Sequence, residues 1–334
     1  SCSNTTATEH RIAMVAHHLH WSHGQATVLT TAAMLADCSF VLPSGNFSPF
    51  ARAPWMGSID DPEILGHLRE LGGDFVCLPF GVGREVRNPP PDWKPLLTGV
   101  TSGRIHGPAA DEEWVVLDAN DTAITLWLHY PETSPVLRVE RTIATHDGEP
   151  TLDCTFRIFA RRSAAISVGL HPILRLPDKP GRLRIDADFA FGLTHPGYGG
   201  AEFSQLDAVR NLSGVVDLGH VPLLSRADLN VQLCGMFGPL RATYLDESAG
   251  LEIDWDRSLL PSLQIWHTDG GIGGAPWHNI FRGIGLEPVA SAFDLDSTVS
   301  CAPNPINARG VATAIQLDPV TPVTIRHTFR AFTA

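Results

Sequence analysis

The sequence predicts an all-β fold in which large antiparallel sheets pack against one another. Three observations support this prediction. Proline (26 residues) and glycine (30 residues) interrupt the 334-residue chain at short intervals. The segments between them are short and β-prone, and several alternate apolar and polar side chains, which is the period of a half-buried strand. Helical periodicity is scarce, and many strands with few helices are typical of a sandwich or a barrel.

The predicted strands follow one another along the whole chain. A polar strand is expected at His17–His23, near the N-terminus. Further strands are predicted at residues 114–118, 123–129, 136–143, 152–159, 166–170, 240–245, 251–255, 263–267, 281–287 and 323–329. His146–Pro150 and Asp246–Gly250 have the composition of tight hairpin turns.

One short helix is expected over Asp61–Glu70. Pro62 suits the first helical turn, and Leu65 and Leu68 share one face. No break in composition suggests a linker, and no internal repeat is visible. We therefore expect a single domain over residues 13–334, preceded by a disordered lead at residues 1–12.

The composition excludes several classes of partner. The formal charge is −12, and the 24 lysines and arginines form no basic run, whereas nucleic acid and anionic membranes require clustered basic residues. No stretch of about 18 apolar residues could span a membrane. The first residues lack the charged and apolar segments of a signal peptide. We expect a cytoplasmic monomer or homodimer that binds neither nucleic acid nor a membrane.

The cysteines and the N-terminal histidines are candidate metal ligands. Six cysteines lie far apart without a CxxC pair, which argues against a zinc knuckle and favours buried free thiols. His17, His18, His20 and His23 could place imidazoles on one strand face, so a metal site is conceivable. No acidic residue lies nearby, and a polar strand explains the pattern more simply. No metal is expected.

Two titratable residues interrupt apolar, strand-like segments. His171 follows the uncharged segment 166–170, Glu287 follows a largely apolar run, and a proline comes after each. An imidazole exchanges protons near neutrality, and a glutamate on an apolar strand is costly without a partner or a task. We interpret the two as a general acid–base pair facing one cleft. The alternatives are a satisfied core histidine and a salt bridge from Glu287 to Arg282 or Arg84.

Three further segments are candidates for the same cleft. Glycines at positions 72, 73, 81 and 83 allow sharp turns beside it, and Arg84 and Arg87 could bind sugar hydroxyls or a carboxylate. The alternative is a glycine-rich connection with solvated arginines. His106 lies in a predicted loop, where functional residues concentrate, although a surface histidine is equally plausible. The loop Thr194–Gly200 could shape the cleft.

Taken in order, these segments resemble the galactose mutarotase-like superfamily, which includes aldose 1-epimerases and hexose-6-phosphate mutarotases. The likeness spans roughly residues 20 to 330. It is carried by short motifs in a shared order, namely Gly72-Gly with Leu78-Pro-Phe-Gly, His106-Gly with Trp114, Val168-Gly-Leu-His-Pro, Asp228-Leu-Asn-Val-Gln-Leu, Pro261-Ser-Leu-Gln-Ile-Trp266 and Leu286-Glu-Pro. The chain departs from the family pattern after His106-Gly, where Pro108-Ala-Ala-Asp replaces the segment that holds an arginine.

The resemblance implies a β-supersandwich with the site on a concave sheet face. It implies that His171 is the acid, that Glu287 is the base, and that His106 and Asp228 bind sugar. Arg84 or Arg87 could substitute for the missing arginine. Trp266, Phe80 or Trp277 could stack on an apolar sugar face.

The predicted activity is that of an aldose 1-epimerase, which interconverts the α and β anomers of an aldose. Ionised Glu287 would take the proton of the C1 hydroxyl while imidazolium His171 protonates the ring oxygen. No metal or organic cofactor is needed. One alternative is a non-catalytic carbohydrate-binding or regulatory protein on the same scaffold. The other is a carbohydrate lyase or isomerase, ranked last because Tyr130, Tyr198 and Tyr244 lie outside the candidate catalytic motifs.

Overall fold

The computed structural model describes residues 15–83, 85–97 and 104–334. The predicted lead at residues 1–12, Cys2 and Arg84 lie outside the described residues. All the strand pairs between the named strands are antiparallel, and most strands belong to two large sheets. The all-β prediction is therefore confirmed.

The larger sheet has nine strands in the order β18-β13-β20-β21-β25-β9-β8-β7-β6. The predicted turns at residues 146–150 and 246–250 join β8 to β9 and β20 to β21. The strands are β6 (Val115–Ala119), β7 (Ala123–His129), β8 (Val136–Thr145), β9 (Thr151–Ala160), β13 (Leu183–Asp186), β18 (His220–Val221), β20 (Leu240–Tyr244), β21 (Ala249–Trp255) and β25 (Val323–Thr333).

The second large sheet has the order β15-β14-β19-β22-β23-β11-β5, and β12 also pairs with β23. Segments from distant parts of the chain meet in it, and they include both predicted acid–base residues. The strands are β5 (Val76–Cys77), β11 (Val168–Leu170), β12 (Ile173–Arg175), β14 (Phe189–Thr194), β15 (Glu202–Phe203), β19 (Leu229–Met236), β22 (Ser262–Asp269) and β23 (Arg282–Ala290).

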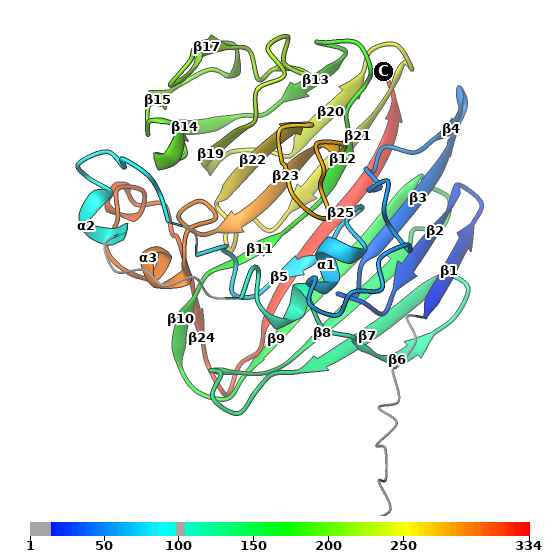
Figure 1. The fold of residues 1–334 in the computed structure, drawn as a ribbon. Helices are drawn as coiled ribbons and strands as arrows, with labels where there is room; N and C mark the ends of the chain where they lie inside the picture. The colour runs from blue at the N-terminus through cyan, green and yellow to red at the C-terminus, as the bar shows by residue number, and fades with distance from the viewer. Residues whose placement is uncertain (1–14, 84, 98–103) are drawn as a thin grey trace, which may run out of the picture.

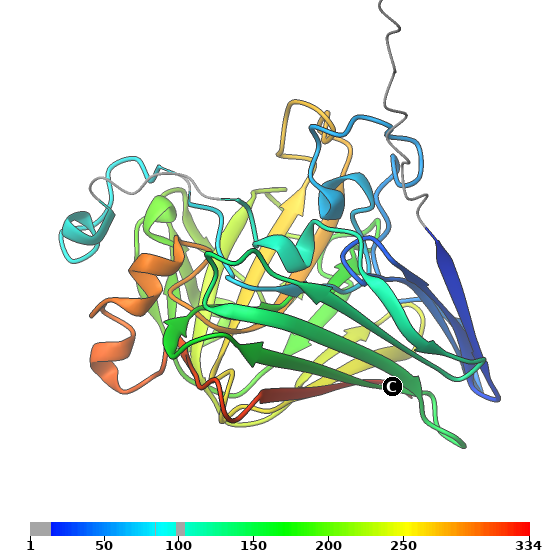
Figure 2. The same cartoon turned by 90° about the horizontal axis from the view of Figure 1, so that it is seen from below.

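Smaller elements flank these sheets. A four-stranded sheet holds β1 (Ala16–Trp21), β2 (Gly24–Leu29), β3 (Leu35–Leu42) and β4 (Gly45–Phe47). Two-stranded pairs join β10 (Ala164–Ile166) to β24 (Ile315–Leu317) and β16 (Val209–Asn211) to β17 (Gly214–Val216). The described helices are short, namely α1 (Gly66–Arg69), α2 (Lys94–Leu97), α3 (Ser297–Cys301) and the 3-10 turns Pro108–Ala110, Pro196–Tyr198, Leu206–Ala208 and Asn307–Arg309. Figures 1 and 2 show α2 and α3 on one side of the molecule and β1 to β4 on the opposite side.

The helix predicted over residues 61–70 is shorter than expected. Only Gly66–Arg69 is helical, and Leu65 at its N-cap makes no side-chain capping hydrogen bond. The Asp61 carboxylate instead accepts the Glu63 N–H at 3.0 Å, inside a separate turn. Asp61 thus stabilises a local turn that competes with the first turn of a longer helix.

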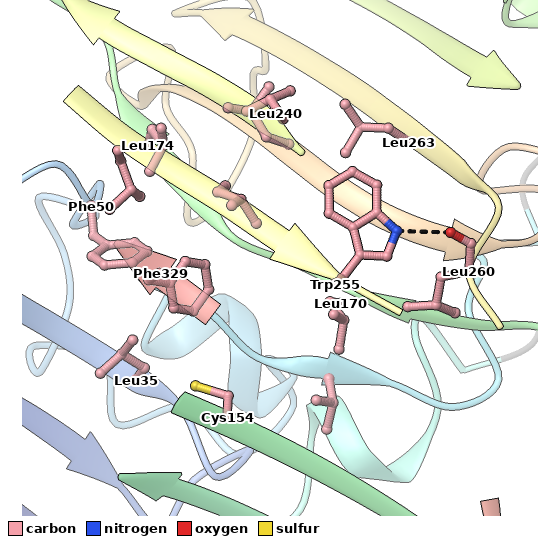
Figure 3. Packing of buried hydrophobic residues seen from close by; sticks show 14 of the residues in the cluster. Leu35, Phe50, Cys154, Leu170, Leu174, Leu240, Trp255, Leu260, Leu263 and Phe329 are labelled. Carbon is pink, nitrogen blue, oxygen red and sulfur yellow. Dashed lines mark hydrogen bonds between the residues drawn. The ribbon is translucent and has the colours of Figure 1, made fainter. Parts of the chain in front are cut away.

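A continuous apolar core holds the two large sheets together. Figure 3 shows Leu263 of β22 near Leu240 of β20 and Trp255 of β21, whose indole N–H donates to the Leu260 carbonyl at 2.8 Å. Successive side chains of a strand point to opposite faces. Because Leu263 and Ile265 belong to this core, the alternate residues of β22 face the other side of the sheet.

Three findings bear on the other expectations. No helix within the described ranges combines the length and apolar character that crossing a membrane requires. Nor does that part of the chain contain a group of three or more His, Cys, Asp and Glu side chains suited to a metal ion. The described cysteines are free, and four are buried, but Cys301 is exposed because it ends the surface helix α3. The expectation of a buried thiol is wrong at that position.

Candidate functional site

A cavity of about 490 Å³ lies against the eight-stranded sheet that contains β22 and β23. It is on the face of this sheet that points away from the apolar core. Its volume lies within the range of small-molecule sites. Six residues predicted from the sequence line it, namely Arg87, His106, His171, Asp228, Trp266 and Glu287. Trp277 also lines the cavity. Phe80 is fully buried and is absent from the lining, so it offers no stacking surface.

His171 and Glu287 are cross-strand neighbours. Both β11 and β12 pair with β23, and they do so in one register, with position 169 opposite 289 and position 173 opposite 285. His171 lies in the short gap between β11 and β12, directly opposite Glu287. His171 Nε2 is 3.4 Å from Glu287 Oε1. Both side chains are largely buried, yet both line the cavity.

The row formed by this pair continues on both sides. Phe75 stacks on the His171 ring with centroids 4.4 Å apart, and its carbonyl accepts the His171 N–H at 2.8 Å. On the other side, Gln264 Nε2 donates to Glu287 Oε2 at 3.1 Å, and Gln232 lies opposite Gln264 on β19. An aromatic ring therefore holds the imidazole, and an amide holds the carboxyl group.

Burial determines the protonation of the pair. Loss of hydration, with His67 as a second cause, lowers the pKa of His171 to about 3. Loss of hydration, with the Asp294 carboxylate as a second cause, raises the pKa of Glu287 well above its usual value, although Gln264 opposes this. The neutral forms of both groups are favoured. The expectation of an imidazolium beside an ionised glutamate is therefore wrong for this state of the protein.

Two further imidazoles line the cavity beside His171. His106, at φ +58°, accepts the Gly81 N–H on Nδ1 at 3.4 Å, so its ring proton lies on Nε2. His67 has the opposite tautomer, because its Nδ1 lies 3.1 Å from the Ala110 carbonyl oxygen, which can only accept. Burial lowers the pKa of His67 to about 4. His106 thus carries a donor at Nε2, and His67 carries an acceptor there.

Asp228 and two tryptophans form another part of the lining. Asp228 Oδ1 accepts the Asp269 N–H at 3.3 Å, and its carboxylate occupies the space that a side chain at Gly271 would need. The rings of Trp266 and Trp277 meet edge to face with centroids 5.9 Å apart. The cavity therefore offers an acidic acceptor close to an aromatic surface, a combination that suits sugars.

The rival interpretation of Glu287 as a salt-bridge partner of Arg282 is not supported. Arg282 Nε lies 2.5 Å from Asp269 Oδ1, and its Nη1 lies 3.2 Å from Asp178 Oδ1. Arg84 lies outside the described residues. Within those residues, the only ion-pair partner of Glu287 is His171.

Sequence reasoning assigned no role to several polar residues of the lining, among them His67, His195, Asn230, Gln264 and Asp294. His195 lies in the loop that was expected to shape the cleft, and His195 Nε2 is 3.1 Å from Asp294 Oδ1. The polar positions on β19 and β22 were visible as interruptions of apolar strands. Their convergence depends on strand pairing, which the sequence does not reveal.

Three solved structures place this architecture among known folds. The GalM/aldose epimerase homologue of Caenorhabditis elegans has a TM-score of 0.66 and 14% identity, covering 96% of this chain and 100% of that chain. A protein of Synechocystis sp. PCC 6803 has a TM-score of 0.67 and 14% identity, and both chains are covered fully. The galactose mutarotase-like protein of Lactobacillus casei ATCC 334 has a TM-score of 0.60 and 15% identity, covering 96% and 100%. No protein-family model and no curated protein matches the sequence. The chain has the galactose mutarotase-like fold.

Proposed function

We propose that this protein is an aldose 1-epimerase, an isomerase that interconverts the α and β anomers of a small-molecule aldose. The observation that carries the proposal is the cross-strand pair of His171 and Glu287, which lines a cavity suited in size to a small molecule. A proton donor and a proton acceptor side by side are what ring opening at C1 requires.

The proposed reaction moves two protons and breaks one bond. Glu287 takes the proton of the C1 hydroxyl while His171 gives a proton to the ring oxygen, and the bond between C1 and the ring oxygen breaks. The resulting aldehyde rotates about the C1–C2 bond. The C5 hydroxyl then adds to the other face of the aldehyde as both protons return, which gives the other anomer and restores the pair.

The protonation preferences of the pair support this cycle. The pair holds one shared proton throughout the cycle. While the sugar ring is closed, the pair is an imidazolium and a carboxylate, and while the sugar is open, it is a neutral imidazole and a carboxylic acid. Burial favours the second arrangement, which accompanies the open-chain aldehyde. The site thereby stabilises the less stable form of the sugar.

Neighbouring residues have chemistry suited to holding the sugar. The Nε2–H of His106 can donate to a hydroxyl, Asp228 can accept from one, and Trp266 can cover an apolar ring face. Arg87 lines the cavity but is exposed to solvent. Arg87 is the one arginine among the described lining residues. Because its side chain is exposed to solvent, we assign it a secondary role in sugar binding.

Exchange NMR between the α and β signals of a panel of aldoses tests the proposal. Purified protein should increase the exchange rate above the buffer-catalysed background. Binding of an aldose without faster exchange would instead favour the non-catalytic carbohydrate-binding alternative. Tyr198 does line the cavity, so the lyase alternative is tested in parallel by the absorbance of an unsaturated uronide product, which we expect to be absent.

The pH dependence of kcat/KM should reflect the pair as a unit. The active form holds one proton, so activity falls as pH rises through the raised pKa of Glu287 and falls again as pH drops toward the lowered pKa of His171, at about 3. The acid limb should therefore lie well below about 6.5, the ordinary pKa of histidine. Exchange rates measured from pH 4 to pH 9 and corrected for background check this, and an acid limb centred near the ordinary value would contradict it.

Gly285→Ala should impair the site without a change to any ionisable group. A β-carbon at position 285 would overlap Glu287 Oε1, so the carboxyl group must move. Displacement of a reacting group by about 1 Å can cost roughly 10²-fold in rate, which is the loss we expect. The matched control is Gly238→Ala, where an added β-carbon meets nothing within 4 Å. Equal exchange rates in the two variants would show that the position of Glu287 is unimportant.

A further inference from the structure

A second imidazole–carboxylate pair lines the same cavity. His195 Nε2 lies 3.1 Å from Asp294 Oδ1, and the two side chains are 13% and 11% exposed. His195 Nδ1 accepts the Gly197 N–H at 2.9 Å, so the ring proton lies on Nε2, the nitrogen that is close to the carboxylate. The imidazole therefore lies directly against the Asp294 carboxylate and restricts where it can point.

The backbone beside Asp294 is held in an unusual conformation. Phe293 is fully buried and has φ +51°, which is strained for a bulky side chain. The backbone N–H of Phe293 donates to Gln232 Oε1 at 2.6 Å. The Nε2 of the Gln232 side chain donates to the Ser291 carbonyl at 2.8 Å. Gln232 belongs to the cross-strand row that contains Glu287. This amide therefore fixes the position of Asp294 relative to the proposed catalytic pair.

Asn230 adds a polar group next to this pair. Its carbonyl accepts the His195 N–H at 2.9 Å, and its side chain lines the cavity while being 6% exposed. Asn230 Oδ1 has no hydrogen-bond partner among the described residues. A buried polar atom at a cavity wall without a protein partner is costly unless a bound group or water satisfies it. This part of the wall is therefore equipped to accept hydrogen bonds from a ligand.

We propose that Asp294, oriented by His195, is a sugar-binding residue that accepts hydrogen bonds from ring hydroxyls away from C1 and thereby determines which epimers the site accepts. This inference rests on the proposed function. An epimer that points this hydroxyl elsewhere cannot donate a hydrogen bond to the Asp294 carboxylate. A site built in this way binds the mismatched sugar less tightly than the matched one.

The test compares wild type and Asp294→Asn on epimeric hexoses and their monodeoxy analogues. Calorimetry gives Kd, and exchange NMR gives KM and kcat. We expect Asp294→Asn to raise Kd and KM by about 10- to 100-fold for the preferred hexose, with a smaller change in kcat and weaker discrimination between epimers. For the deoxy sugar that lacks the contacted hydroxyl, wild type and Asp294→Asn should bind equally.

Two other variants keep the test decisive. His195→Gln should weaken sugar binding with the same dependence on the deoxy position, because it perturbs the orientation of Asp294. This variant replaces Asp294→Asn in the test if Asp294→Asn folds poorly. Asp188→Asn removes an exposed carboxylate outside the cavity lining and should leave binding unchanged. An unchanged Kd in Asp294→Asn, or the same loss for every deoxy sugar, would overturn the inference.

The binding measurements also separate this inference from the proposed function. If wild type binds aldoses without faster anomer exchange, the epimerase proposal fails, and the deoxy-sugar pattern still decides the role of Asp294. If wild type speeds exchange but Asp294→Asn retains its epimer preference, only the role of Asp294 is rejected. Absence of any aldose binding by wild type would overturn both.

Discussion

Glu287→Gln is expected to slow enzyme-catalysed anomer exchange by about 10²- to 10⁴-fold, the usual contribution of a positioned proton transfer. The amide has nearly the shape of the carboxylic acid but cannot exchange a proton with the C1 hydroxyl. Its oxygen can still accept from Gln264 Nε2, which donates to Glu287 Oε2 in the structure. Exchange NMR at matched protein concentration measures the loss.

The stability of Glu287→Gln provides the control for this prediction. Because burial raises the pKa of Glu287, the folded protein favours the neutral acid, which the amide mimics. The melting temperature at neutral pH should therefore change little. His171→Gln should lose comparable activity, and the double variant should lose little more, because groups that act as a unit are not additive. Full activity in either single variant would reject the assigned pair.

The sequence signal that singled out His171 and Glu287 has a physical basis. A charged or titratable residue within a period-2 apolar segment is conspicuous, because burying it costs free energy unless it has a partner or a task. The sequence therefore indicated both residues separately. The arrangement that brings them together depends on the register of β11 and β12 against β23, which local composition does not specify.

The residues that were missed share one property. Gln264, His195 and Asp294 each acquire their place in the site through contacts with distant segments. The protonation states were also mispredicted for a tertiary reason. Hydration of His171 and Glu287 is lost only when β5, β11 and β23 assemble, so reference pKa values could not anticipate the neutral pair.

A buried ion cluster supports the row that contains this pair. Asp74, directly before Phe75 in the chain, forms an ion pair with Arg141, and both are completely buried. The Arg141 guanidinium also donates to the carbonyl oxygens of Ala33 at 2.7 Å and Asp74 at 3.1 Å. His327 Nε2 lies 3.3 Å from Asp74 Oδ2. The cluster thus connects β8 and β25 to the segment that holds the His171 ring.

Arg141→Met should destabilise the protein by about 3–5 kcal/mol, because it leaves Asp74 as an uncompensated buried charge. Urea unfolding followed by tryptophan fluorescence measures this loss. The matched control is Arg184→Met, which removes an exposed ion pair with Asp186 and should cost at most about 1 kcal/mol. Similar losses in the two variants would show that the buried cluster contributes no more than a surface pair.

The pH dependence distinguishes the lost charge pairing from lost packing in Arg141→Met. Burial alone would raise the pKa of Asp74, but Arg141 and His327 outweigh it and hold that pKa below its usual value. This stabilisation is present above the unfolded pKa of about 3.9 and is lost as pH falls through the lower folded value. Without Arg141 the sign reverses, since burial then favours protonated Asp74. The stability difference between wild type and Arg141→Met should therefore be largest near neutrality and narrow below about pH 4, whereas a packing defect would leave it constant.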